Sequence, residues 1–103
     1  MSISTHVLDA ATGRPAIGVP VTLSRRTGEG WTVLAEAATD ADGRVPRLAA
    51  DTPAGTYRLH FDTAARNEFF PEVLITFVIA DAVAHHHVPL LLSPFAYSTY
   101  RGS

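Results

Sequence analysis

The stretch Tyr57-Arg58-Leu59-His60-Phe61 decides the fold class, because its apolar residues alternate strictly with an arginine and a histidine. A period of two places the apolar side chains on one face of a β-strand and the polar side chains on the other. The same alternation recurs in residues 19–24, 31–37 and 73–79. Short strands with one apolar face therefore predict an all-β protein.

Turn sequences rich in glycine, proline and aspartate separate these runs. The four turns are Thr12-Gly13-Arg14-Pro15, Gly28-Glu29-Gly30, Asp40-Ala41-Asp42-Gly43 and Pro53-Ala54-Gly55. Seven or eight short strands at this spacing indicate an antiparallel β-sandwich. Residues 63–67 can form one helical turn at most. The length of 103 residues predicts a single domain that spans residues 1–103.

The composition excludes several partners. A formal charge of −2 without a basic cluster disfavours nucleic acid. No apolar run approaches the ~18 residues that a membrane-spanning helix needs. The chain contains no cysteine, and its first residues show no charged start followed by an apolar run. We therefore expect a cytoplasmic protein that binds neither nucleic acid nor membrane.

The segment His85-His86-His87-Val88-Pro89-Leu90-Leu91-Leu92 carries apolar residues on both faces of its expected strand. One face holds His86, Val88, Leu90 and Leu92, and the other holds His85, His87, Pro89 and Leu91. A sandwich strand normally has one wet face, so we expect another subunit to cover the outer one. This places His85 and His87 at or beside a subunit interface.

Three interpretations of the histidines follow. His85 and His87 point the same way on a strand and, with His6 as a third ligand, would suit a metal ion. Alternatively, they are polar groups satisfied within an interface. In the third interpretation, His6 and His87 both face outward and form a pair that transfers protons to and from a water nucleophile.

Two further positions carry chemistry. Arg44 follows a turn and is either an ordinary surface arginine or a fixed cation that holds a planar anionic ligand. The nearby Asp40 and Asp42 lack the downstream ligands of a calcium loop. Residues 97–103 alternate as in a strand and predict an anchored C-terminal end, where Ser103 supplies a hydroxyl and a carboxylate.

Together these residues resemble the transthyretin-related family of 5-hydroxyisourate hydrolases. The resemblance rests on Ser4-Thr5-His6-Val7-Leu8-Asp9, Asp42-Gly43-Arg44, Phe69-Phe70-Pro71-Glu72, the segment from His85 to Pro94 and the ending Tyr100-Arg101-Gly102-Ser103. It extends in order over essentially the whole chain. His86 departs from the family pattern, in which tyrosine is commoner.

The resemblance implies an eight-stranded transthyretin-like sandwich that assembles into a homotetramer with active sites between subunits. It implies hydrolysis of 5-hydroxyisourate to 2-oxo-4-hydroxy-4-carboxy-5-ureidoimidazoline without metal or other cofactor. The family's catalytic residues fall on His6, Arg44, His87 and Ser103, and its substrate-binding residues on His6, Arg44 and Tyr100. His85 matches a family histidine near the site.

The alternative from a different class is a transthyretin-like carrier of small aromatic ligands, which would have a permissive apolar channel. The histidines, Arg44 and the terminal tetrapeptide favour the hydrolase. If the Ser103 end takes part in the reaction, a C-terminal tag will damage activity more than stability.

Overall fold

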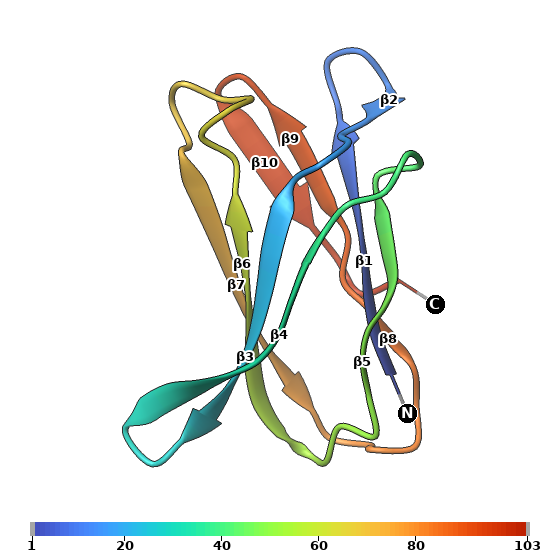
Figure 1. Cartoon of the computed structure of the whole chain (residues 1–103), viewed down its shortest axis with the longest axis vertical. Helices are drawn as coiled ribbons and strands as arrows, with labels where there is room; N and C mark the ends of the chain where they lie inside the picture. The colour runs from blue at the N-terminus through green and yellow to red at the C-terminus, as the bar shows by residue number, and fades with distance from the viewer. Residues whose placement is uncertain (1, 103) are drawn as a thin grey trace.

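The computed structural model describes residues 2–102 and contains two β-sheets that face each other across an apolar interior (Figure 1). The strands are β1 (Ser2–Asp9), β2 (Arg14–Pro15), β3 (Pro20–Thr27), β4 (Gly30–Ala38), β5 (Arg44–Ala50), β6 (Gly55–Asp62), β7 (Glu72–Ile79), β8 (His86–His87), β9 (Leu90–Ser93) and β10 (Ala96–Thr99). Two of them are two-residue strands, so the eight longer strands confirm the predicted all-β sandwich.

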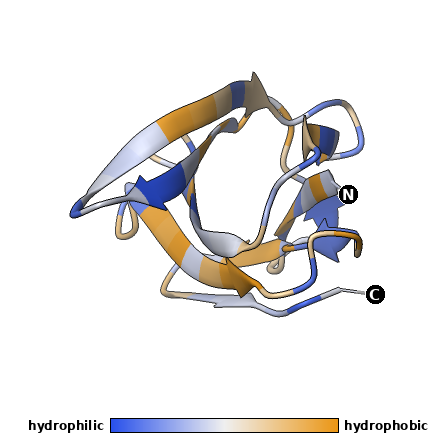
Figure 2. Cartoon of the chain, turned by 90° about the horizontal axis from the view of Figure 1, so that it is seen from below, coloured by the Kyte–Doolittle hydropathy of each residue, from blue (hydrophilic) through white to orange (hydrophobic). Residues whose placement is uncertain are grey.

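The four-stranded sheet has the order β4-β3-β6-β7, and all its neighbours are antiparallel. Tyr57, Leu59 and Phe61 of β6 are fully buried, which confirms the alternation that predicted this strand. Leu59 lies between Leu23 of β3 and Ile75 of β7. Figure 2 shows the resulting bands of apolar and polar residues along the strands that enclose the interior.

The second sheet is organised around β1. This strand pairs antiparallel with β2 and β5 and parallel with β8 and β9, and β10 extends the sheet beyond β9. Segments from both ends of the described chain therefore meet on β1. Figure 1 shows the start of β1 and β8 on the same side of the molecule.

The segment that was predicted as one strand from His85 to Leu92 is interrupted. β8 and β9 are separated by Val88 and Pro89, and Pro89 has no N–H group to donate to a neighbouring strand. Both pieces nevertheless keep one register, since Ser4 pairs with His87 and Val7 with Leu90. The predicted core face is correct: His86, Val88, Leu90 and Leu92 are all buried.

The expected helical turn at residues 63–67 is present as a single turn. The backbone N–H groups of Arg66 and Asn67 both donate to the Thr63 carbonyl, at 2.9 Å each. Residues 2–102 contain no helix with the length and apolar character that crossing a membrane requires.

Candidate active site

The outer face of β1 carries the first group of candidate site residues. Ile3, Thr5 and Val7 point into the core and are 0–1% exposed, so Ser4 and His6 lie on the opposite face. This alternation confirms the orientation expected for His6. The core residues thus fix the direction in which the polar side chains of β1 project.

A tight turn positions Arg44 beside His6. The Asp40 carboxylate accepts hydrogen bonds from the backbone N–H groups of Asp42 and Arg44, at 2.9 Å each. These bonds, the Arg44 one foremost, lower the pKa of Asp40. Gly43 adopts φ +74°, and a Cβ atom there would lie 2.5 Å from the Val7 carbonyl oxygen. Aspartate and glycine therefore build this turn, which ends with Arg44 directly opposite His6 on β1.

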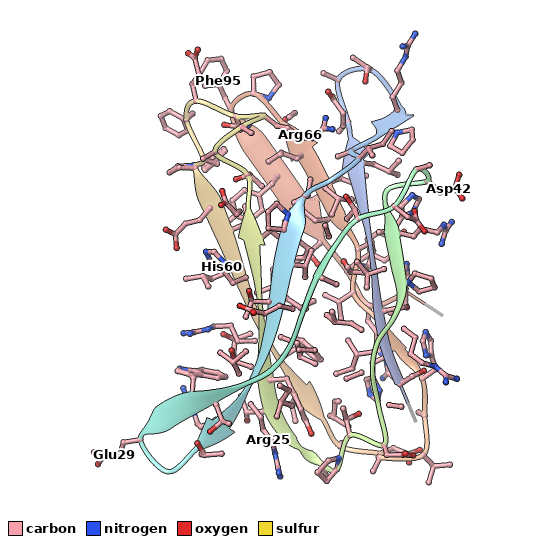
Figure 3. All side chains as sticks on the ribbon, in the orientation of Figure 1. Arg25, Glu29, Asp42, His60, Arg66 and Phe95 are labelled. Atoms are coloured by element: carbon pink, nitrogen blue, oxygen red, sulfur yellow. The ribbon has the colours of Figure 1, made fainter. Side chains whose placement is uncertain are left out.

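The His6 ring is fixed by the same turn. Its Nε2 atom lies 2.9 Å from the carbonyl oxygen of Asp42, which can only accept a hydrogen bond. His6 therefore carries a proton on Nε2, and in the neutral ring Nδ1 is the free acceptor. Figure 3 shows Asp42 at the tip of the turn between β4 and β5, at the edge of the molecule.

Ser4 is hydrogen-bonded to His85 and His87, the two histidines that face outward from the segment at β8. Its Oγ atom is hydrogen-bonded to His87 Nδ1 at 2.7 Å and to His85 Nε2 at 2.9 Å. On the far side of the His85 ring, Nδ1 is hydrogen-bonded to Ser2 Oγ at 2.5 Å. Ser4 is only 6% exposed although it faces away from the core, because these imidazoles cover it.

A cavity of about 300 Å³ lies at this place, lined by Ser4, Thr5, Arg44, Pro46, His85 and His87. Its position follows from an irregularity in the pairing of β1 with β5. Ile3 pairs with Ala49 and Thr5 with Val45, so residues 46–48 lie opposite Ser4 alone. The extra residues separate the two strands locally. Arginine, imidazole and hydroxyl groups line the space that results.

The surroundings of His87 disfavour its protonated form. Burial lowers its pKa below the ordinary value of 6.5, and the positive charges of Arg44, His6 and His85 lower it further. The ring is therefore neutral at pH 7. A neutral imidazole beside a fixed guanidinium can accept a proton from water while the cation stabilises negative charge.

The C-terminal segment returns to His87. The Gly102 N–H donates to the His87 carbonyl at 2.8 Å, and a Cβ atom at Gly102 would lie 2.6 Å from His87 Cδ2. Tyr100 is 60% exposed and is absent from the lining of this cavity as formed by residues 2–102. Ser103 lies outside the described residues.

A second and larger cavity, of about 580 Å³, lies elsewhere. Its lining includes Arg66, Phe69 and Phe95, and it has no histidine among the described residues that line it. The Arg66 guanidinium donates to the Ile17 carbonyl at 2.7 Å and is thus occupied in holding a loop. Figure 3 shows Arg66 and Phe95 at the upper end of the sandwich, and Figure 1, in the same orientation, shows β1 beginning at the lower end.

The metal-binding interpretation of His6, His85 and His87 has no preassembled site within residues 2–102. Within residues 2–102, no three histidine, cysteine or acidic side chains are grouped closely enough to hold a metal ion. His85 and His87 instead bind a common serine hydroxyl, and His6 binds a backbone carbonyl.

The comparison with protein families decides the identity. Residues 3–102 match the HIUase/Transthyretin family. The chain belongs to this family. Its relatives include a 5-hydroxyisourate hydrolase of Caulobacter vibrioides that is 46% identical, with 98% of this chain and 97% of the relative covered. The 5-hydroxyisourate hydrolase of Salmonella dublin is 44% identical, covering 98% of this chain and 80% of the relative.

Solved structures agree with the HIUase/transthyretin assignment. The 5-hydroxyisourate hydrolase of Klebsiella pneumoniae is 44% identical and superposes with a TM-score of 0.87, covering 99% of this chain and 98% of that one. Transthyretin of Sparus aurata superposes with a TM-score of 0.90 at 34% identity, covering 98% and 96%. Both kinds of family member thus share this sandwich.

Sequence reasoning missed the contacts of Ser4, and it left His85 without a defined contact. The alternation of Ser2, Ser4 and His6 was a usable signal, since it places both serines on the face that carries His6. The proximity of Ser4 to both histidines, however, depends on the parallel register of β1 and β8.

Proposed function

We propose that this chain hydrolyses 5-hydroxyisourate to 2-oxo-4-hydroxy-4-carboxy-5-ureidoimidazoline. The observation that carries the proposal is the cavity in which a neutral His87 lies close to the Arg44 guanidinium, in a chain that matches 5-hydroxyisourate hydrolases over nearly its whole length. This combination supplies a base and a fixed cation, which an acyl-transfer reaction on an anionic ring requires.

In the proposed reaction, His87 Nε2 takes a proton from water as the water oxygen attacks the lactam carbonyl. Arg44 stabilises the resulting oxyanion and holds the planar substrate through its fork of donors. The tetrahedral intermediate then collapses, the carbon–nitrogen bond breaks, and the departing nitrogen receives a proton from an imidazolium. His6, whose Nε2–H is held by the Asp42 carbonyl, orients the substrate through Nδ1 or, as an imidazolium, supplies this proton from Nδ1.

Residues 1–103 act as one catalytic domain in this proposal, and no cofactor is required. Tyr100 contacts the substrate and Ser103 orients a histidine or the water, as the family resemblance implies. We further propose a homotetramer whose subunits close the cavity. The exposed face beside His85 and the open cavity support that assembly. The cytoplasmic location stays a prediction.

The decisive experiment generates 5-hydroxyisourate in place with urate oxidase and follows its ultraviolet decay with and without this protein. The expected result is decay well above the spontaneous rate, retained in the presence of chelator. Decay at the spontaneous rate would overturn the proposal and favour a transthyretin-like carrier. Activity that is lost in chelator and restored by metal would instead favour the metal-dependent interpretation of the histidines.

A further inference from the structure

The hydroxyl of Ser4 lies between two imidazoles, and this arrangement constrains where protons can be. Ser4 Oγ contacts His87 Nδ1 at 2.7 Å and His85 Nε2 at 2.9 Å. A hydroxyl has one proton and can accept two hydrogen bonds, and the two rings are the partners that Ser4 Oγ has among residues 2–102. With no other acceptor there for its proton, it donates to one ring and accepts from the other. Since Ser4 is almost completely buried, bulk water does not compete for these contacts.

Counting protons leaves two arrangements when both rings are neutral. In one, His87 Nδ1–H donates to Ser4 and the Ser4 hydroxyl donates to His85 Nε2. His85 then carries its proton on Nδ1 and donates to Ser2 Oγ, 2.5 Å away. In the other, every hydrogen bond is reversed and both rings carry their proton on Nε2. The two histidines must therefore share the same tautomer.

We propose that Ser4 is a positioning residue that couples His85 and His87 into a proton relay running from the cavity to the exposed Ser2–His85 contact. The proposal rests on the hydrolase function proposed above and adds a role for a residue that does not itself act on the substrate. In the first arrangement Ser4 holds the His87 proton on Nδ1, which leaves Nε2 free as the base.

The relay step balances in protons and charge. When His87 Nε2 takes a proton from water, the ring becomes an imidazolium. It can pass its Nδ1 proton to Ser4 Oγ while the Ser4 hydroxyl proton moves to His85 Nε2. His87 is then neutral with its proton on Nε2, and the positive charge lies on His85.

This displacement of charge is favourable in the observed surroundings. Burial and the charge of Arg44 disfavour an imidazolium at His87. His85 is exposed, so water can solvate its charge and take up the proton. The relay therefore moves the positive charge from the half-buried His87 to the exposed His85.

Imidazole nitrogen chemical shifts test the coupling without any substrate. In protein labelled with ¹⁵N in histidine and held at pH 8, we expect His85 and His87 to report the same tautomer. In Ser4→Ala the His87 shifts should move toward those of an imidazole in water. His86 is the internal control, because its Nδ1 faces the Ala84 carbonyl at 3.1 Å and should keep its tautomer in both proteins. Opposite tautomers in the wild type, or unchanged His87 shifts in Ser4→Ala, would overturn the relay.

Kinetics supply the second readout. We expect Ser4→Ala to lower kcat by about 10-fold or more with a much smaller change in KM, because proton transfer rather than binding is affected. Ser4→Thr keeps the hydroxyl and should restore most of kcat. Thr63→Val removes a buried hydroxyl that donates to the Phe70 carbonyl in the segment between β6 and β7, and it controls for lost stability.

The two proposals fail in different ways. A wild-type protein without hydrolase activity would overturn the proposed function and leave the tautomer measurement valid. An active wild type with full kcat retained in Ser4→Ala would overturn the relay alone. So would a Ser4→Thr protein that melts like the wild type but is as slow as Ser4→Ala.

Discussion

Histidine and arginine side chains lie near one another on both sheets, and only one of the two groups is suited to catalysis. On the four-stranded sheet, His60 lies 3.4 Å from the Glu72 carboxylate, and the Arg58 guanidinium lies 4.3 Å from the centre of the Trp31 ring. On the other sheet, Arg44 and His87 line a cavity, and burial lowers the pKa of His87. Figure 3 shows His60 and Asp42 on opposite sides of the molecule.

The difference teaches that surroundings, and not residue types, make these groups reactive. The His60 and Glu72 side chains are 36% and 59% exposed, so water screens their attraction. On that sheet His60 is already paired with Glu72, and Arg58 lies over the Trp31 ring. The neutral His87 ring is hydrogen-bonded to the Ser4 hydroxyl and lies near the Arg44 cation, and an open volume remains in which a reacting molecule can lie.

The largest effect expected is the loss of turnover in Arg44→Ala, His87→Ala and His6→Ala. Each should lower the rate of 5-hydroxyisourate hydrolysis by at least about 10²-fold, because a base, a proton donor or the oxyanion's cation is removed. His60→Ala is the matched control from the other sheet and should stay within about 2-fold of the wild type. A slow His60→Ala protein, or a fast His87→Ala protein of unchanged oligomeric state, would contradict the assignment of catalysis to the group around His87.

A smaller effect is expected in Gly102→Ala. The added Cβ atom would lie 2.6 Å from His87 Cδ2, so the ring or the C-terminal segment must shift. We expect turnover to fall by about 10-fold, because small displacements of a catalytic group are costly. Gly30→Ala controls for the substitution itself, since a Cβ atom there meets nothing within 4 Å. Equal turnover in the two variants would show that the packing of Gly102 on His87 has no role in the reaction.

The smallest effect concerns pH. Because the pKa of His87 lies below 6.5, its neutral form persists as the pH falls through 6.5. The acid limb of kcat/KM should therefore lie below pH 6.5. Arg44→Gln removes one of the positive charges that disfavour the imidazolium, so the pKa of His87 should rise in that variant. Titration of the His87 ring by nuclear magnetic resonance measures its pKa in the wild type and in Arg44→Gln.

The lowered pKa of His87 also makes the free energy of unfolding depend on pH. A lowered pKa in the folded state means that the unfolded chain binds the proton more readily. Stability is thus unaffected by His87 above pH 6.5 and decreases as the pH falls below it, until the folded-state pKa is passed. A His87→Gln protein should lack this component in its unfolding free energy as a function of pH. An acid limb above pH 6.5 would contradict the assignment of His87 as the base.

The fold was predictable because its information is local. Alternation identified the buried faces of residues 57–61 and 73–79, and the turn residues at 40–43 identified the position of Arg44. The orientation of His6 followed from the same rule, since Thr5 and Val7 had to face the core.

The contacts of Ser4 and Gly102 were not predictable in this way. Alternation states which face a side chain occupies, but it does not state which distant residue will cover that face. Ser4 meets His87 only because β8 pairs with β1 in a particular register, and Gly102 meets it only because the chain folds back after β10. Such long-range pairings depend on the whole fold.

The central position of β1 has a consequence for how the protein is made. β1 is translated before β8 and β9, yet it pairs with both of them, across 83 residues in the contact between Ser4 and His87. A nascent chain therefore carries the apolar Ile3 and Val7 without their final neighbours until synthesis has passed residue 93. Pairings this distant in sequence form slowly and leave strand edges open to aggregation. The cavity beside Arg44 is lined by His85 and His87, so a translation product that stops before β8 lacks two of the side chains that form it.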